Sequence, residues 1–219
     1  MNIKKLLKFL SDLKENNDRN WFNQNKSIYN DLRNEFLEFV RILIEKISEF
    51  DEDIVNLQPE DCIFRIYRDI RFTSDKTPYK TNFGAFIAKG GRKLERAGYY
   101  VHFEPGDCFL AGGIYRPSNE ILKKIRNEIY YNIEEFLKII NNKEFVAYFK
   151  TIDGEKLVKV PIDFPSDFEY GELLKYKSYN IVYDMNEKFL FDKNLVNNII
   201  SILKLMYPFN KFINEAIDN

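Results

Sequence analysis

Residues 98–115 read GYYVHFEPGDCFLAGGIY, and this stretch decides the fold. It holds two runs rich in aromatic and other strand-forming residues, 98–104 and 107–115, on either side of a short turn that contains Gly106. A similar run, residues 82–89, precedes them. Strands this close in sequence usually pair antiparallel. The middle of the chain is therefore predicted to fold as an antiparallel meander.

The residues before the meander have helical periodicity. Apolar side chains recur at spacings of three and four over residues 3–15 and again over 28–47, which predicts two helices with one buried stripe each. Asp18 is placed to cap a short turn between them. Residues 62–67 are rich in strand-forming residues and are predicted as a further strand.

After the meander the pattern becomes helical again. Pro117 cannot donate to a sheet ladder and Ser118 is a favourable cap, so a helix is predicted to begin there and to continue to about residue 150, with a break near Asn141. Four more elements are predicted in the C-terminal part: a strand at 156–160, a helical turn at 170–175, a strand at 178–184 and a helix over 192–216 that ends or kinks at Pro208.

The order helix, sheet, helix, hairpin, helix predicts an α+β fold. We expect a largely antiparallel sheet packed by N-terminal, central and C-terminal helices. The chain of 219 residues fits a single domain over 1–219, with a helical part at about 1–55 and a mixed β/α part at about 56–219.

Composition narrows the setting of the protein. The only two cysteines, Cys62 and Cys108, are too few for a small secreted domain, which favours a reducing compartment, and both are interpreted as core residues. Charged residues interrupt the N-terminal apolar stripe, so it does not read as a signal peptide. No run approaches the ~18 apolar residues of a membrane span. We expect a cytoplasmic protein without a membrane partner.

The net charge of −1 conceals an asymmetry. Residues 64–96 hold nine basic and three acidic side chains, a charge of +6, which leaves 24 basic and 31 acidic residues, or −7, for the rest. A protein that binds long nucleic acid usually has a broad basic surface and a high pI, whereas this chain has a pI near 6.0. A compact anion therefore suits the basic segment better than a duplex.

Residues 64–80, FRIYRDIRFTSDKTPYK, concentrate this charge. The arginines recur every three residues, which matches no strand face, so the chain is predicted to bend after Tyr67. Arginine presents a rigid fork of donors that suits phosphate or carboxylate. We expect a small anionic ligand here. The predicted anion-binding residues are Arg65, Arg68, Arg71, Lys76 and Lys80, with Asp75, Tyr79 and Glu104 in supporting positions.

Two side chains are candidates for acid–base catalysis. Asp69 lies among the cations, and His102, the only histidine, shares a strand face with Tyr100 and Glu104. A glutamate beside a histidine can hold one tautomer and leave the other nitrogen for proton transfer. The alternative for both is structural: arginine–aspartate pairs that tie a loop to the core, and a strand histidine with a local hydrogen bond.

No cofactor and no metal are predicted. One histidine and two separated cysteines exclude the usual zinc spacings. Asp69 and Asp75 sit among cations that would repel Mg²⁺. The glycines at 90–91 and 112–113 lack the strand-to-helix phosphate fingerprint.

Several motifs together resemble a known family. They are Asn17–Phe22 (NDRNWF), residues 64–80, Gly98–Pro105 (GYYVHFEP), Gly112–Pro117 (GGIYRP) and Glu172–Tyr179 (ELLKYKSY). The chain resembles a mostly bacterial, uncharacterised family, the domain-of-unknown-function family numbered 2461, and the likeness covers nearly the whole chain. It departs from the family pattern at Asn82 and Ala111, neither of which is a charged position. The resemblance implies no particular activity.

Three functions remain open, and so does the question of whether the protein is an enzyme. The first is an enzyme or binding protein for a small anion, whose basic side chains would converge on one pocket. The second is a nucleic-acid-associated protein that uses residues 64–96. The third is a structural or partner-binding protein in which the charged loop is internal scaffolding, so that Arg68→Ala would reduce stability.

Overall fold

The structure, a computed structural model, describes residues 1–219, and it begins with three helices. These are α1 (Ile3–Glu15), α2 (Arg19–Gln24) and α3 (Lys26–Ile47). The Asp18 side chain accepts hydrogen bonds from two backbone N–H groups of α2, as its position in the sequence predicted. The long helix α3 buries its apolar stripe, including Phe36 and Phe39.

Four strands form one antiparallel sheet in the order β1-β2-β3-β4. They are β1 (Phe83–Ile87), β2 (Gly98–Phe103), β3 (Phe109–Ile114) and β4 (Tyr179–Asp184). The first three are the predicted meander, and β4 adds to its edge by pairing with β3. The predicted α+β fold class with a largely antiparallel sheet is therefore confirmed.

The two faces of the sheet have different surroundings. One face carries Val101, Leu110 and Ile181, which are fully buried. The C-terminal helix α10 (Leu195–Asp218) packs on this face. Helix α3 also contacts this face: the rings of Phe36 and Phe39 lie 6.3 and 5.8 Å, centroid to centroid, from the ring of Phe103. The approach of α10 is so close that a Cβ at Gly112 would lie 3.0 Å from Met206.

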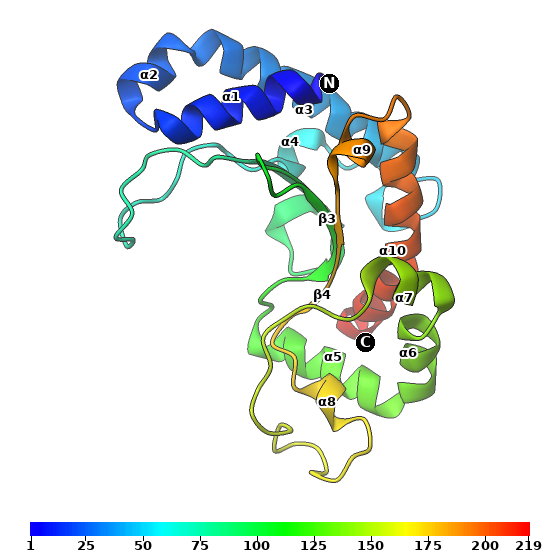
Figure 1. Cartoon of the computed structure of the whole chain (residues 1–219). Coiled ribbons are helices and arrows are strands. Elements are labelled where there is room, and N and C mark those ends of the chain that lie inside the picture. The colour runs from blue at the N-terminus through cyan, green and yellow to red at the C-terminus, as the bar shows by residue number, and fades with distance from the viewer.

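The opposite face, which we call the open face, is not covered by a helix. Its residues follow from the strand register, in which Phe86 pairs with Tyr100, Tyr100 with Ala111, and Ala111 with Val182. In Figure 1 the sheet stands edge-on at the centre, with α10 to its right and loops to its left. Because side chains alternate along each strand, one face packs into the core and the other faces the loops.

Shorter elements complete the chain. They are α4 (Pro59–Cys62), α5 (Asn119–Tyr131), α6 (Ile133–Ile140), α7 (Lys143–Phe149), α8 (Gly171–Leu174), α9 (Glu187–Leu190) and the 3₁₀ turns η1 (Glu52–Ile54) and η2 (Gly91–Lys93). Helices α5, α6 and α7 gather around the end of α10 in Figure 1. A cluster of 50 buried apolar residues forms the core. No helix combines the length and the apolar character that a membrane span requires.

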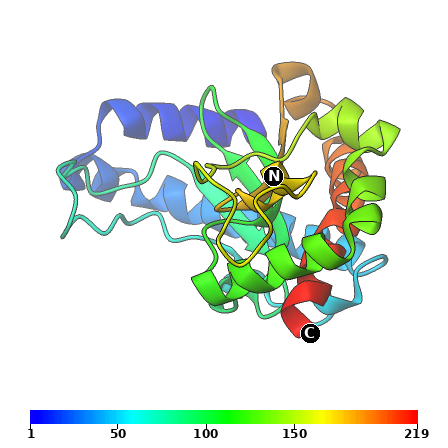
Figure 2. The same cartoon turned by 90° about the horizontal axis from the view of Figure 1, so that it is seen from below.

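The segment between α4 and β1 turns back on itself. The N–H of Phe64 donates to the carbonyl of Gly84 at 3.0 Å, and the N–H of Lys80 donates to the carbonyl of Ile66 at 2.7 Å. Residues 69–77 project beyond these contacts as a loop, which we call the arm. In Figures 1 and 2 the arm reaches away from the sheet on the side opposite α10. A bend was predicted directly after Tyr67, but the two legs of the segment are still paired at Arg68, whose N–H bonds the carbonyl of Pro78 at 2.9 Å. The chain bends further out, at Arg71, Phe72 and Ser74.

Two predicted strands were wrong. Residues 62–67 begin at the end of α4 and continue as extended chain with isolated bridges, so Cys62 is helical. Residues 156–160 form only the single bridge between Lys156 and Tyr176, and the predicted C-terminal hairpin is absent. In both places the residue types favour strands, but the neighbouring segment offers too few backbone partners. Pro208 lies inside α10 and does not end it.

Candidate functional site

A cavity of about 810 Å³ lies against the open face. Its floor is the cross-strand row of Phe86, Tyr100, Ala111 and Val182. The base of the arm and the turn around η2 supply cations to its lining, while Asp107, Asp153 and Asp184 also line it. A concave site with an apolar floor and a few polar groups at its edge is the usual form of a small-molecule site.

Phe64 gathers two of these cations. The Nζ atom of Lys80 and the guanidinium carbon of Arg92 each lie 5.2 Å from the centre of its ring. The ring of Tyr100 packs edge-on against the same ring, 6.0 Å away. All four residues line the cavity. We call Phe64, Lys80 and Arg92 the rim.

Neither rim cation forms an ion pair with a carboxylate. Arg92 donates through Nε to the carbonyl of Asp61 at 3.1 Å, and Lys80 makes no side-chain hydrogen bond. Burial lowers the pKa of Lys80, and the neighbouring charges of Arg65 and Arg92 lower it further. An anion placed here would relieve both the lost hydration and the mutual repulsion of the cations.

The predicted cations of the arm do not join this group. Arg68 bonds Asp75 and Thr77, Arg71 pairs with Asp69 at 2.6 Å between Nη2 and Oδ2, and the Nζ of Lys76 donates to a backbone carbonyl 2.9 Å away. The five predicted cations, Arg65, Arg68, Arg71, Lys76 and Lys80, therefore do not all meet in one pocket. Arg68 and Lys80 do line a smaller hollow of about 310 Å³, together with Asp75 and Tyr79. Of the five cations, only Lys80 lines the large cavity, and only Arg65 is close enough for its charge to lower the pKa of Lys80.

These pairings occupy the carboxylates proposed for proton transfer or support. The hydrogen bond from Arg71 is the largest cause of a lowered pKa at Asp69, and the bond from Arg68 is the largest cause at Asp75, whose pKa falls to about 2. A carboxylate that holds its charge so firmly is a poor proton acceptor near neutral pH. The geometry thus favours a structural role for Asp69 and Asp75.

Tyr79 has a structural role as well. It is buried, and its ring stacks on Phe22 with centroids 4.0 Å apart. The side chain of Asn17 bonds both the N–H and the carbonyl of Tyr79, at 3.1 and 3.0 Å. The N-terminal helices therefore hold the base of the arm, which fixes the position of the next residue, Lys80.

The other cations of residues 64–96 are also largely neutralised. Lys89 pairs with Asp53 at 2.9 Å, and Lys93 pairs with Asp61 at 2.8 Å. Arg96 is buried and bonds Asp218 at the end of α10. With Arg68 and Arg71, five of the nine cations of this segment are in ion pairs. Much of the +6 charge is therefore neutralised within the protein and is not free for a ligand.

A hydrogen-bonded chain of side chains lies on the open face next to the cavity. The hydroxyl of Tyr100 and Nδ1 of His102 are 2.8 Å apart, and Nε2 of His102 and Oε2 of Glu104 are 3.2 Å apart. The hydroxyl of Thr81 donates to Oε1 of Glu104 at 2.7 Å. The ring of His102 stacks on Phe109, with centroids 4.6 Å apart and planes at 15°. The predicted association of His102 with Glu104 is therefore present.

The acceptors in this chain assign the histidine tautomer. An ionised Glu104 can only accept, so the neutral ring of His102 carries its hydrogen on Nε2. Nδ1 then accepts the hydrogen of the Tyr100 hydroxyl. Burial, and next the charge of Glu104, raise the pKa of Tyr100 to about 12. Tyr100 is therefore protonated at neutral pH and has a base as its hydrogen-bond partner.

Donor atoms that metals favour gather at the same place. One atom each from His102, Glu104 and Asp107 lie within 4.8 Å of one another. Both carboxylate oxygens of Glu104 already accept hydrogen bonds, one from His102 and one from Thr81. His102, Glu104 and Thr81 thus form one hydrogen-bonded network in the structure.

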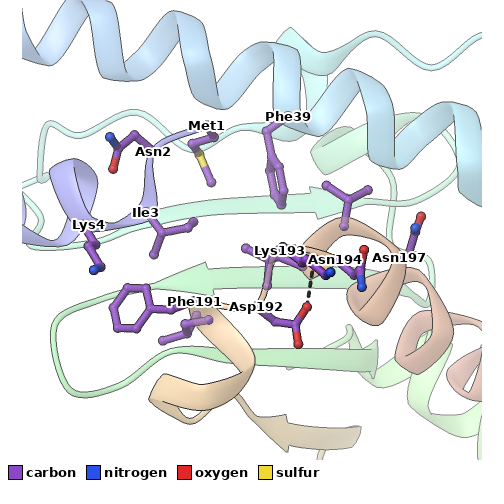
Figure 3. A pocket seen from close by; sticks show the side chains of 13 residues that line it. Met1, Asn2, Ile3, Lys4, Phe39, Phe191, Asp192, Lys193, Asn194 and Asn197 are labelled. Atoms are coloured by element: carbon purple, nitrogen blue, oxygen red, sulfur yellow. Dashed lines mark hydrogen bonds between the residues drawn. The ribbon is translucent and has the colours of Figure 1, made fainter.

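A second hollow lies between the start of α1 and the start of α10 (Figure 3). It measures about 650 Å³ and includes Asp192, whose carboxylate accepts from the N–H of Asn194 at 2.7 Å. Lys4 lies over the ring of Phe191, 5.3 Å from its centre. Its lining includes no carboxylate or histidine that is hydrogen-bonded to another acid or base, so the open-face cavity is the better candidate site.

Two of the residues that shape this site were not predicted from the sequence as site residues. Phe64 and Arg92 are 28 positions apart and share no periodic pattern, so nothing in the sequence places them together. The position of Tyr100 could be inferred from the sequence, because alternation along a strand puts it on the same face as His102.

Comparisons with known proteins give one match. A family model described as "Conserved hypothetical protein (DUF2461)" matches residues 5–212. No curated protein and no solved structure in these comparisons matches the chain.

Proposed function

The chain belongs to the DUF2461 family, and we propose that it binds a small phosphate- or carboxylate-bearing molecule in the open-face cavity. Lys80 and Arg92 bind the anionic group, and Arg65 adds to the positive potential. The observation that carries this proposal is the position of Lys80 and Arg92: both lie 5.2 Å from the ring of Phe64 beside the cavity, and neither pairs with a carboxylate.

The cost of this arrangement supports a ligand. A partly buried ammonium near two guanidinium groups is destabilised by lost hydration and by repulsion, and the lowered pKa of Lys80 reflects both. Arginine provides a donor fork and lysine a compact charge, a combination that suits phosphate or carboxylate oxygens. The apolar floor then accepts the remainder of the ligand.

The opposite charges in the cavity favour a compact ligand. Asp107, Asp153 and Asp184 line the same cavity, and none of them pairs with a cation. A polyanion that extended across the open face would meet these carboxylates. A small anion at the rim would not, which favours this function over the nucleic-acid alternative.

The two thiols support the expected reducing, cytoplasmic setting. Cys62 and Cys108 are free and buried. Burial raises the pKa of both, that of Cys62 to about 12, so both are neutral thiols at physiological pH. They belong to the core and are not proposed as nucleophiles.

A thermal-shift screen followed by titration calorimetry tests the proposal. Inorganic phosphate, small carboxylates and phosphate esters would be screened with the wild-type chain. The proposal expects at least one to raise the melting temperature, because a ligand that binds only the folded state stabilises it. For that compound, Lys80→Met should reduce affinity by roughly 30-fold, equivalent to about 2 kcal/mol, as truncation of a desolvated charge partner does.

The matched control is Arg71→Met, which removes a cation of the arm that is already paired with Asp69. It should leave the affinity within about twofold. Equal losses in the Lys80 and Arg71 variants would show that the effect is only one of net charge. If none of these compounds stabilises the wild-type chain, the proposal is rejected.

A further inference from the structure

The hydrogen-bonded chain on the open face ends at Tyr100, a residue that lines the cavity. Tyr100 lines the cavity, whereas His102 lies behind it and is 7% exposed. Glu104 completes the series on the far side of the histidine. A hydroxyl, a base within hydrogen-bond reach and a third group that orients the base are the three parts of an activated nucleophile.

We infer that Tyr100 is a reactive nucleophile of this cavity, with His102 as its proton acceptor and Glu104 as the residue that positions His102. Its substrate is a small anion that carries an electrophilic phosphoryl or acyl centre, of which a phosphate ester is the simplest case. The identity of the substrate rests on the proposed anion site, but the reactivity of Tyr100 does not.

The geometry around Tyr100 is specific. Gly84 lies under its side chain, and a Cβ at that position would lie 2.6 Å from the hydroxyl oxygen. The absence of a side chain at Gly84 therefore leaves the space in which the hydroxyl meets His102. Phe109 holds the imidazole by stacking, and Thr81 holds the carboxylate of Glu104. Each member of the series is thus oriented by a neighbour outside it.

A tyrosine that stays protonated at neutral pH needs this base. As Oη attacks phosphorus, the Oη–P bond forms, and the hydroxyl proton passes to Nδ1 of His102. The resulting imidazolium is stabilised by the carboxylate of Glu104. The bond from phosphorus to the leaving oxygen breaks, and that oxygen takes the proton from His102. Water then attacks the phosphorylated tyrosine, which releases phosphate and restores the hydroxyl of Tyr100.

The rim lies close enough to assist. Tyr100 and the two rim cations all approach the ring of Phe64, at 6.0, 5.2 and 5.2 Å. Cations beside a nucleophile stabilise the negative oxygens of a phosphoryl group during transfer. A ligand bound by Lys80 and Arg92 would therefore bring its electrophilic centre into the cavity that Tyr100 lines.

Aryl sulfonyl fluorides test this reactivity without knowledge of the substrate. With such a probe the Oη–S bond forms, fluoride leaves and the proton passes to His102. The whole chain would be treated with benzenesulfonyl fluoride, and the modified tyrosines would be quantified by peptide mass spectrometry. Tyr115 is an internal control, because it lines the same cavity and is 69% exposed, which is more than Tyr100. Accessibility alone therefore favours Tyr115.

We expect Tyr100 to react at least about tenfold faster than Tyr115, which is a small part of the roughly 100- to 10,000-fold that general base catalysis typically contributes. His102→Gln should remove most of this advantage without changing the rate at Tyr115, provided that its circular dichroism and melting match those of the wild type. If that variant does not fold, Glu104→Gln serves in its place. A rate at Tyr100 no higher than that at Tyr115 in the folded wild type would overturn the inference.

Two further readouts separate the roles. His102 is the only histidine, so its nitrogen-15 NMR signals are unambiguous, and the hydrogen should reside on Nε2 in the wild type and be redistributed in Glu104→Gln. An unchanged tautomer would show that Glu104 does not position the ring. Para-(fluorosulfonyl)benzoate adds a carboxylate to the probe. If the anion site is correct, it labels Tyr100 faster than the uncharged probe does; equal rates with labelling retained would reject the anion site alone.

Discussion

The arm and the rim both belong to the basic segment, but their charges are in different states. In the arm, Arg71 pairs with Asp69 two residues earlier, and Arg68 at its base pairs with Asp75. At the rim, Lys80 and Arg92 lie against Phe64 beside a cavity and have no carboxylate partner. The segment with the higher charge density is therefore the one with less charge to offer a ligand.

This difference teaches where a functional site is to be sought. Charge that is neutralised within a loop stabilises that loop locally, and exposed ion pairs of this kind contribute little to overall stability. Charge that stays unpaired in a partly desolvated position has a free-energy cost that a ligand can offset. Three changes test the contrast, beginning with the one of largest expected effect.

Gly84→Ala should be the most disruptive of these changes, because it inserts a methyl group into the packed floor beneath Tyr100. The new Cβ would lie 2.6 Å from the hydroxyl oxygen and 3.1 Å from two ring carbons. We expect a loss of about 1 to 3 kcal/mol in the free energy of unfolding, as is typical of overpacking. Chemical denaturation measures it, and loss of the Tyr100–His102 hydrogen bond should alter the histidine NMR signals.

Tyr100→Phe provides a double-mutant control for that change. It removes the oxygen that makes the closest contact, so the cost of Gly84→Ala should be smaller in the Tyr100→Phe background. Ser74→Ala in the exposed arm is the counterpart, and it should have no measurable effect on unfolding. Strictly additive costs for Gly84 and Tyr100 would mean that the two residues do not meet as described.

The second prediction concerns the amine of Lys80. Its pKa is lowered, so at pH 8.5 a larger fraction of it is the free amine than for a lysine with the ordinary pKa of 10.5. We expect acetylation by a limiting amount of an activated ester to modify Lys80 before Lys76 of the arm, as measured by peptide mass spectrometry. A bound anion should slow the reaction at Lys80 and leave Lys76 unchanged.

The same shift gives a pH dependence of known sign. The unfolded chain holds the Lys80 proton up to its ordinary pKa, whereas the folded chain releases it at lower pH. Stability should therefore rise with pH between the lowered pKa and 10.5, and Lys80→Met should remove that rise. In the acetylation experiment, faster modification of Lys76 than of Lys80 would indicate that the ammonium of Lys80 is better solvated than it is in the structure.

Much of the fold follows from periodicity, because burial imposes it. The stripe of α1 reflects one buried face, and β2 is recognisable from its strand-forming residues, so helices and strands of the core are readable. Residues 62–67 have strand-like composition, yet only isolated bridges form there. A sequence shows which residues favour a strand but does not show how many backbone partners another segment will offer.

The site was less predictable than the fold, for a related reason. His102 and Glu104 were found because they are two residues apart on one strand. Lys80 was found only as one of five cations, since the sequence does not show which of them Asp69 and Asp75 neutralise. Phe64 and Arg92 meet through the path of the chain around η2, which no local pattern encodes.

Arg68→Ala should have the smallest effect, and it decides between a site and a scaffold. The side chains of Arg68 and Asp75 are 27% and 53% exposed, so their pair is accessible to solvent. We expect the melting temperature to change by less than about 2 °C. The arm itself should loosen, which limited trypsin cleavage within residues 69–77 would detect.

Protonation of Asp75 provides the same test without a substitution. Its pKa of about 2 in the folded chain lies below the ordinary 3.8, so the pair contributes fully above pH 4 and is lost as pH falls through about 2. Asp75→Asn should reproduce that loss at neutral pH, with faster cleavage of the arm and unchanged global melting. If the melting temperature of either variant fell by many degrees, the arm would be scaffolding on which the fold depends. The ion pairs of the arm would then matter to the whole fold, and the contrast drawn between arm and rim would be wrong.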